Sequence, residues 1–200
     1  MKVIEYHERT KHFPNRPANS AGYLDWATEP NPFRSYEGTS PIQLPFSNSV
    51  SGADYLDLFI RNNNKFQPFS LTNIARLLEL SMGLSAWKSH SGTSWALRMN
   101  PSSGNLHPTE AHLVLSPILE NNNSGGVFHY NPLSHVLEPR AVFDEQFWLR
   151  LENHFCQKGF LIALTSIYWR ESWKYGERAF RYCNHDIGHA MTCLSTTDRK

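Results

Sequence analysis

Cysteine is scarce in this chain, and the few cysteines present form no disulfide pattern. Cys156, Cys183 and Cys193 are an odd number and have no close spacing. Small secreted domains that depend on disulfides carry an even set of cysteines in a compact pattern. A disulfide framework is therefore not expected, and the cysteine content predicts a cytoplasmic protein.

Long apolar runs and an excess of charge of one sign are also missing. The best apolar run, Phe160 to Tyr168, is strand-sized and too short to span a membrane. The first residues, Met1 to Glu8, carry acids where a signal peptide would have its apolar core. The net charge is +1 at pH 7, which gives no reason to expect nucleic acid or an anionic membrane as a partner.

What is present divides the chain in two. Residues 1–50 contain six prolines among Asn, Ser, Thr and aromatic residues, and no helical or alternating period holds for long. This composition predicts an extended arm held on a folded body by Tyr23, Trp26, Phe33 and Tyr36; a disordered tail is the alternative. Residues 51–200 are long enough for one domain with its own core.

The second part has mixed periodicities, which predict an α+β domain. Helices are expected from Ser51 to Ile60, and from Ser70 to Gly83 with Ile74, Leu77, Leu78 and Met82 on one face. Ala111 to Leu115 is expected to be a strand, and Val127 to Tyr130 with His135 to Leu137 a hairpin. Asp144 is expected to cap a helix to about Gln157, with Phe147, Leu151 and Phe155 inward. Phe160 to Tyr168 is expected to be a central buried strand, followed by helices at Arg170–Tyr175 and Ala179–Leu194.

The segment of greatest functional interest is the Pro-Ser-Ser-Gly-Asn loop at residues 101–105, which leads through His107-Pro108-Thr109-Glu110 into the first expected strand. The loop offers two hydroxyls, a carboxamide and several backbone N–H groups. Gly104 permits a positive φ and close approach of a ligand, and the flanking prolines restrict the loop. A rigid, donor-rich edge suits a flat heterocycle such as an isoalloxazine. An ordinary turn between two elements is the alternative.

This loop resembles the Pro-Ser-Ser-x-Asn-x-x-Pro segment of the FMN-dependent nitroreductase family. Its His-Pro-Thr-Glu ending resembles the SagB/ThcOx-type azoline-dehydrogenase branch. The resemblance implies a nitroreductase-like mixed sheet flanked by helices, FMN as the cofactor, and hydride transfer through flavin N5. The small-molecule substrates that it implies are an azoline-type heterocycle, or a nitro or quinone acceptor. The implied FMN contacts here are Arg98, Pro101, Ser102, Ser103, Asn105 and Glu110.

A second segment, Arg61-Asn62-Asn63-Asn64-Lys65, combines two cations with three carboxamides. Such a set suits a phosphate dianion, although a charged, Asn-rich surface turn is the common alternative. The nitroreductase family has an Arg-x-Ser-x-Lys/Arg signature here, and it contacts the FMN phosphate. Arg61 and Lys65 match it, and Asn63 replaces the serine.

Lys174 and Tyr175 stand in a Lys-Tyr-Gly-x-Arg context. Oxidation of a carbon next to nitrogen needs a base for one proton, and a lysine of lowered pKa with a tyrosine partner could serve. In the azoline-dehydrogenase branch this pair is taken to be catalytic. The alternative is the start of an amphipathic helix with its cation in solvent.

The segment Asn184 to His189 allows two interpretations. His185 and His189 have the i, i+4 spacing of metal ligands, and His-Asp-Ile-Gly also occurs in HD-type metal phosphohydrolases. His154 and Asp198 would then have to complete the site. The nitroreductase-like branch instead has Asp-x-Gly-His here, on a packing and interface helix. We favour this second interpretation and expect no metal.

The chain ends soon after this helix, whereas relatives continue into a segment that supplies basic FMN-phosphate ligands and reaches a partner. We therefore expect an FMN-binding domain that is incomplete at its C-terminus, paired as a homodimer or with a second nitroreductase-like module. The alternative function is a non-catalytic dimerising or remnant module that has lost full FMN binding.

Overall fold

The computed structural model describes residues 2–47, 68–117, 125–155 and 159–198. The helix expected at 51–60 and the expected phosphate ligands Arg61, Asn63 and Lys65 lie outside these residues. In chain order the described elements are α1 (Val3–Thr10), η1 (Trp26–Thr28), β1 (Ile42–Gln43), α2 (Leu71–Met82), β2 (Leu84–His90), β3 (Thr93–Arg98), η3 (Ser103–Asn105), β4 (Thr109–Leu115), β5 (Gly125–Asn131), β6 (Val136–Phe143), α3 (Glu145–Phe155), β7 (Leu161–Ser166), α4 (Tyr168–Tyr175), η4 (Gly176–Arg178) and α5 (Ala179–Asp198).

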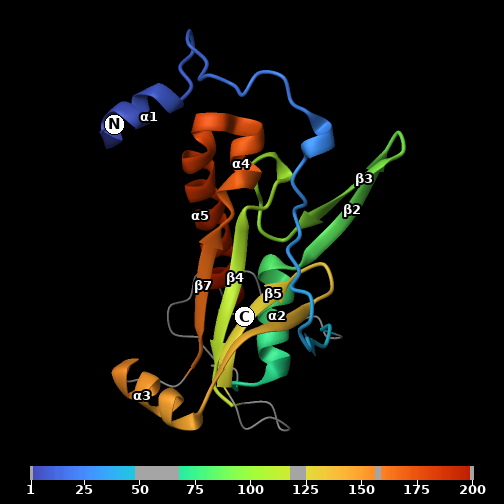
Figure 1. Ribbon diagram of the computed structural model, residues 1–200, viewed down its shortest axis with the longest axis vertical. Helices are drawn as coiled ribbons and strands as arrows, with labels where there is room; N and C mark the ends of the chain where they lie inside the picture. The colour runs from blue at the N-terminus through green and yellow to red at the C-terminus, as the bar shows by residue number, and fades with distance from the viewer. Residues whose placement is uncertain (1, 48–67, 118–124, 156–158, 199–200) are drawn as a thin grey trace.

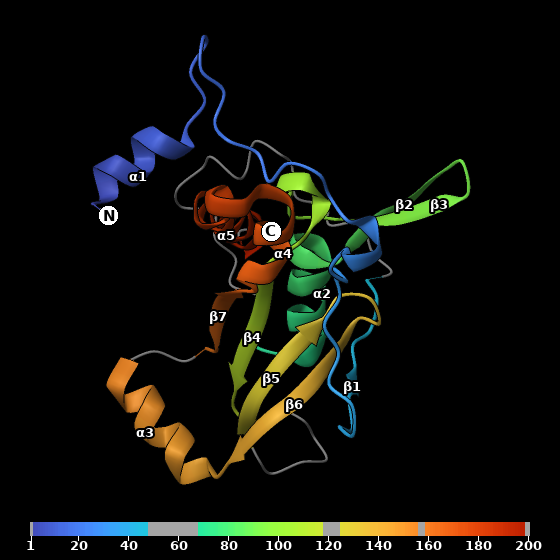
Figure 2. The same ribbon diagram turned by 45° about the horizontal axis from the view of Figure 1, so that its top comes forward.

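The centre of the fold is a five-stranded sheet with the order β1-β6-β5-β4-β7, which Figure 2 shows across its width. Each described pairing in it is antiparallel, where the resemblance implied a mixed sheet. The hairpin β5–β6 was expected, and its register places His129 opposite Glu138. The α+β class is confirmed.

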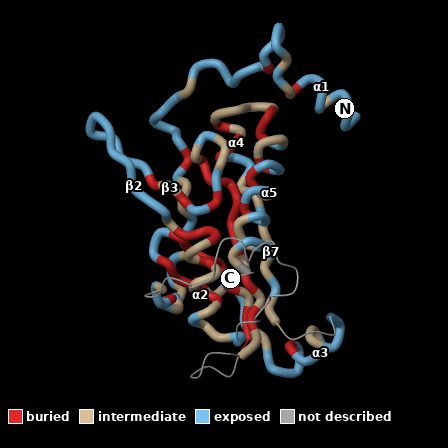
Figure 3. Tube along the Cα trace, turned by 180° about the vertical axis from the view of Figure 1, so that it is seen from behind, coloured by how far each residue is buried: buried red, intermediate tan, exposed pale blue. Residues whose placement is uncertain are grey.

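Two helices, α2 and α5, pack on one face of this sheet and close the core (Figure 1). Ser70 begins α2 as expected, because its hydroxyl accepts a hydrogen bond from the Asn73 N–H at 3.3 Å. Alternation along β4 sends Ala111, Leu113 and Leu115 into this core, each at most 2% exposed. The helix side of the core comes from Ile74, Ala75, Leu78 and Met82 of α2 and Ala190 of α5. Figure 3 shows these buried segments at the middle of the molecule.

The hairpin β2–β3 was not predicted. It extends away from the body (Figure 1) and is mostly exposed. Its tip is a two-residue turn in which Ser91 has φ 48° and Gly92 has φ 82°. Positive φ at both positions is what a tight hairpin with right-twisted strands requires. The Ser-Gly dipeptide between two Trp-containing segments was therefore a usable signal.

Two sequence-based placements are wrong. The apolar run after Phe160 forms β7, which lies at one edge of the sheet. Among the described strands, its one partner is β4. Its residues alternate between exposed and half-buried, because Ile162 and Leu164 pack on the core while Ala163 faces outward. An apolar run does not distinguish an edge strand with small outward residues from a central strand.

In α3 the expected inward face is also wrong. Phe147 and Phe155 are 43% and 50% exposed, while Trp148 is 6% exposed. Trp148 stacks on Phe143 with ring centroids 6.3 Å apart. Because α3 lies beyond the end of the sheet (Figure 1), it has a narrow buried stripe rather than a full face on the core. Its start at Asp144 was predicted correctly, since the Asp144 carboxylate accepts from the Phe147 N–H at 2.8 Å.

The N-terminal segment begins with a helix, α1, that the sequence did not predict, and then runs over α4 and down to β1 (Figures 1 and 2). Three of its expected aromatic anchors make ring contacts. Trp26 packs edge-on against Trp173 at 5.4 Å, and Tyr36 packs edge-on against His129 at 5.2 Å. Phe33 lies 6.5 Å from Trp87, whereas Tyr23 is 92% exposed. Across the described ranges, no helix has both the length and the apolarity needed to cross a membrane.

Candidate functional site

The Pro-Ser-Ser loop and the Lys174–Tyr175 pair, which are far apart in the sequence, meet in the fold. The Lys174 Nζ donates to the Gly104 carbonyl at 3.4 Å. Gly104 has φ +63°, and a Cβ built on it would lie 2.5 Å from the Tyr175 hydroxyl oxygen and 3.0 Å from the Lys174 Cδ. Only glycine therefore lets the loop lie this close to the end of α4.

Asp186 of α5 anchors the loop from behind. Its carboxylate accepts from the Ser102 hydroxyl at 2.6 Å, from the Ser103 N–H at 2.9 Å and from the Ser103 hydroxyl at 2.9 Å. Asp186 is fully buried, and its charge is stabilised by these donors. The two serine hydroxyls, expected as ligand donors, are thus already used inside the protein. The sequence did not reveal this role, although an acid within an amphipathic helix was a signal for it.

The rest of the loop is also tied internally. The Asn105 carboxamide donates to the Ala96 carbonyl at 2.8 Å, and its oxygen lies 2.9 Å from the His107 Nε2. The His107 N–H donates to the Ser102 hydroxyl at 2.8 Å. Both Asn105 and His107 have positive φ, 60° and 49°. This backbone conformation is strained in residues other than glycine, and the hydrogen bonds within the loop hold it in place. Burial, followed by the charges of Arg98 and Arg170, lowers the pKa of His107 to about 3.

A few donors remain open at the loop surface. Within the part of the chain that the structure describes, the backbone N–H groups of Ser102 and Gly104 donate to no protein acceptor. Gly104 and Pro101 are exposed, and the Pro101 carbonyl lies 3.2 Å from the His189 Nδ1. The open edge of the loop therefore consists of backbone, next to Lys174 and Tyr175.

Glu110, expected at the ligand face, is inside the protein and 2% exposed. The Arg170 guanidinium donates to one of its oxygens, and the His129 Nε2 lies 2.6 Å from the other. Burial by itself would raise the pKa of Glu110. The hydrogen bond with His129 and the charges of Arg170 and Arg98 outweigh burial and lower that pKa. The alternation of β4 explains the difference, because Glu110 lies on the face of the sheet opposite α2 and α5, where it meets His129 and Arg170.

Arg98, another expected ligand contact, is turned toward the N-terminal arm. It is 6% exposed and donates to the Pro32 carbonyl. Its guanidinium carbon lies 5.2 Å from the Phe33 ring centroid, a cation–π contact. Burial lowers its pKa to about 10. Arg98 therefore fixes the arm to the end of β3.

Tyr175 and Lys174 are both half-buried. Burial first, and then the charge of Glu171, raise the pKa of Tyr175, so its hydroxyl stays protonated at neutral pH. The Tyr175 ring packs on Tyr182 at 4.4 Å. The preceding Trp173 donates its indole N–H to the Thr28 hydroxyl at 3.1 Å, which fixes the end of α4 to the arm.

The alternative metal site finds no support. Among the described residues there is no group of three or more His, Cys, Asp or Glu side chains placed to hold a metal ion. His185 and His189 are exposed, whereas Asp186 points inward to the two serines. His154 lies on α3, at the opposite end of the molecule (Figure 1).

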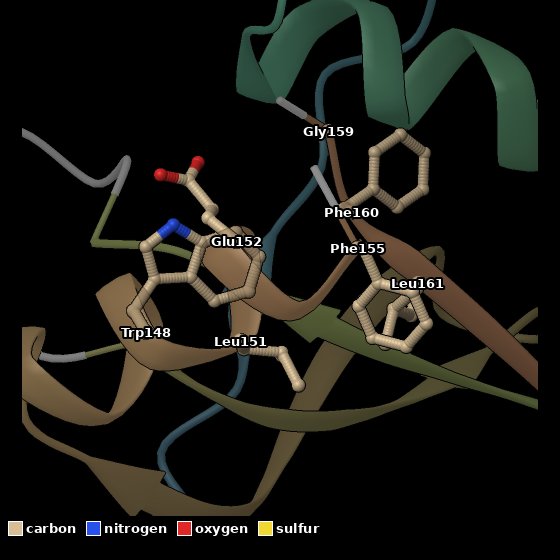
Figure 4. Close-up of a pocket in the computed structure, with 7 residues that line it drawn as sticks. All are labelled: Trp148, Leu151, Glu152, Phe155, Gly159, Phe160 and Leu161. Carbon is tan, nitrogen blue, oxygen red and sulfur yellow. The ribbon is translucent and has the colours of Figure 1, made fainter. Parts of the chain in front are cut away.

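A cavity of about 280 Å³ lies away from this site, between α3 and the start of β7 (Figure 4). Its walls are mostly aromatic and aliphatic, and among the described residues that line it Glu152 alone is ionisable. The cavity is at the α3 end of the sheet, whereas the loop and α4 are at the other end (Figure 1). Its chemistry and its position both separate it from the Lys174–Tyr175 pair.

No family model matches this chain, and no curated protein matches its sequence. Solved structures do match. A candidate nitroreductase from Anabaena variabilis is 28% identical with a TM-score of 0.69, over 96% of this chain and 37% of that one. A candidate nitroreductase from Ralstonia eutropha is 17% identical with a TM-score of 0.53, over 84% of this chain and 80% of that one.

This chain has a nitroreductase-like fold. The microcin synthetase McbBCD of E. coli, solved with truncated pro-MccB17 bound, shares it at 20% identity and a TM-score of 0.50, over 98% of this chain and 82% of that one. The present chain thus spans well under half the length of the Anabaena protein.

Proposed function

We propose that this chain is an oxidoreductase module of the nitroreductase superfamily that binds FMN at the Pro-Ser-Ser loop, next to Lys174 and Tyr175. The observation that carries the proposal is the contact of Gly104 with both side chains. Two segments that were each selected from the sequence for flavin chemistry form one surface, and the fold is that of nitroreductases.

The residues at this surface fit an isoalloxazine ring. Gly104 leaves the backbone open to a ligand, and the N–H groups of Ser102 and Gly104 can donate to ring carbonyls and nitrogens. The flavin, when bound, supplies the hydride chemistry. Arg61, Asn63 and Lys65 are the proposed phosphate contacts, and their positions lie outside the described residues.

Lys174 and Tyr175 are the proposed proton-transfer groups. Burial keeps the Tyr175 hydroxyl protonated at neutral pH, so it is suited to donate a proton. Lys174 is suited to accept one when it is neutral. The proposed substrate is an azoline-type heterocycle, by the SagB-type context of the pair; a small nitro or quinone compound is the second choice.

FMN titration of the purified protein, followed by flavin fluorescence, tests the proposal. Binding is expected, and turnover should fall by about 10²-fold in Lys174→Ala and in Tyr175→Phe while flavin content is unchanged. Lys88→Ala, on the exposed hairpin β2–β3, and Tyr23→Phe, at a side chain that is 92% exposed, are the matched controls. A folded protein that binds no FMN would disprove the cofactor assignment.

A dimerising module without catalysis is the second candidate, and one surface favours it. Tyr168, Trp169, Phe180 and Met191 of α4 and α5 are 47%, 59%, 55% and 59% exposed. Tyr168 and Phe180 stack with ring centroids 6.2 Å apart, and a contiguous exposed apolar patch often marks a binding face. Pairing with a second copy or a second nitroreductase-like module would cover it. Light scattering tests this, and a stable monomer without FMN binding would contradict both candidates.

A further inference from the structure

Glu171 is a fully buried carboxyl group with no visible partner. Its exposure is 0%, and neither carboxylate oxygen has a hydrogen-bond partner among the described residues. Buried polar groups almost always have one, so an exception calls for an explanation. Glu171 precedes Lys174 and Tyr175 by three and four residues in α4, which places all three on one helix face.

The groups around Glu171 belong to the candidate site. Lys174 and Tyr175 of α4, and Asp186 and Cys183 of α5, are the titratable groups that interact with it electrostatically. Asp186 already accepts hydrogen bonds from Ser102 and Ser103. Two acids in one buried place cannot both ionise cheaply. The hydrogen bonds from Ser102 and Ser103 stabilise the charge of Asp186, whereas no described group donates to Glu171. Glu171 is therefore the acid that remains neutral.

We propose that Glu171 carries a proton at neutral pH and is a positioning residue of the site: its neutral form lets α4 pack against the Asp186 carboxylate that anchors the Pro-Ser-Ser loop. Loss of this proton would place a second negative charge behind the loop and next to Tyr175. The loop and the Lys174–Tyr175 pair would then separate. The inference rests on the proposed function only for its effect on FMN.

The pH range of the effect follows from the surroundings of Glu171. Burial first, and then Asp186, raise the pKa of Glu171 to about 8, against the smaller opposing effect of Lys174. A folded-state pKa raised above the unfolded value of 4.5 means that the folded protein binds this proton more tightly than the unfolded chain. The corresponding stability is complete below about pH 4.5 and is lost as the pH rises to about 8.

The first measurement needs no flavin. Chemical denaturation of the wild type, Glu171→Gln and the exposed control Glu145→Gln is compared between about pH 6 and pH 9. Wild type and control should lose stability as the pH rises, and Glu171→Gln should lose clearly less. An equal loss in all three overturns the proposal. Infrared spectroscopy of the wild type is independent of any variant: a protonated carboxyl band should be present at neutral pH and vanish at alkaline pH, and its absence at neutral pH also overturns the proposal.

The second measurement is FMN affinity over the same range. It should weaken several-fold in the wild type, on the order of the tenfold change that one pKa unit represents, and stay constant in Glu171→Gln. A parallel decline in both contradicts the positioning role. If no protein binds FMN at any pH, the proposed function fails, while the denaturation and infrared results still decide whether Glu171 holds its proton.

Discussion

At the scale of single residues, Gly104 determines which groups can meet at the site. Gly104→Ala would place its Cβ 2.5 Å from the Tyr175 hydroxyl oxygen, on a backbone with φ +63°. We expect a loss of about 2–4 kcal/mol in unfolding free energy, because overpacking adds to left-handed strain. FMN affinity should also fall.

Gly92→Ala is the matched control for this change. Gly92 has φ +82° and nothing within 4 Å of a Cβ, so it should show the backbone strain alone, about 1–2 kcal/mol. Denaturant titration of both variants separates the two effects. Equal losses would mean that Tyr175 does not press on the loop.

Asp186 provides a second prediction at this scale. Asp186→Asn keeps the shape of the side chain but removes the charge that Ser102 and Ser103 bind. We expect a loss of about 1–3 kcal/mol in unfolding free energy, as for other buried charge-assisted hydrogen bonds. His185→Asn on the exposed side of the same helix is the control. A variant as stable as this control would show that the carboxylate does not hold the loop.

The segments that form the site were more predictable from the sequence than the way in which their side chains face. Gly104, Lys174 and Tyr175 were selected by type and context, and the fold brings them together. Glu110 was assigned to the ligand because it follows the loop, yet strand alternation turns it inward to Arg170 and His129. Glu171 gave no sequence signal, because its isolation depends on the packing of α4 against α5.

At the scale of elements, a buried polar layer joins β4, β5, β6 and α4. His129 lies between Glu110 and Glu138, at 2.6 Å and 2.9 Å, and Arg170 binds Glu110 from α4. Tyr36 of the arm covers this layer, with the Arg140 guanidinium carbon 3.6 Å from its ring centroid. The arm is therefore attached to the face of the sheet opposite the apolar core.

Arg170→Ala tests this layer. Removing one partner of a buried ion pair leaves an uncompensated charge, so the loss in unfolding free energy should be about 3–5 kcal/mol. The double variant Arg170→Ala/Glu110→Ala should lose less than the sum of its single changes. Arg150→Ala, on the exposed side of α3, is the control. Additive losses would mean that the two charges do not stabilise each other.

The elements with a strong period were the most predictable. Helix α2 and the strands β4, β5 and β6 follow from apolar spacing and turn residues. The placement of β7 could not follow, because an apolar strand reads the same at the edge and in the centre of a sheet. Helix α1 has a single buried residue, Thr10, so it left little apolar signal in the sequence.

At the scale of the whole molecule, the sheet separates two ends with different chemistry. The loop, α4 and the arm form one end, with buried charges and strained backbone; α3 and its apolar cavity form the other (Figures 1 and 4). Ionisable groups of perturbed pKa gather around the first end: His107, Glu110, Glu171 and Tyr175. The unfolding free energy of the protein should therefore change with pH as these groups gain or lose protons.

Acidification should remove the contribution that the neutral His107 makes to stability. It is neutral in the folded protein, because burial lowers its pKa from 6.5 to about 3, while an unfolded His107 takes up a proton below about pH 6.5. The stability from this depressed pKa is complete above pH 6.5 and is lost as the pH falls toward 3. At pH 5 the loss from His107 alone should be about 2 kcal/mol, and the proton that the folded protein holds at Glu171 opposes it.

His107→Asn separates this contribution from the others, because asparagine tolerates the positive φ of 49° at this position and does not titrate. Between about pH 7 and pH 5 the unfolding free energy of the wild type should fall by about 2 kcal/mol relative to that of His107→Asn, because the effect of Glu171 is common to both proteins. The exposed His185→Asn variant should follow the wild type. If the difference in stability between the wild type and His107→Asn does not change over this pH range, the buried imidazole is protonated in the folded protein and burial does not lower its pKa.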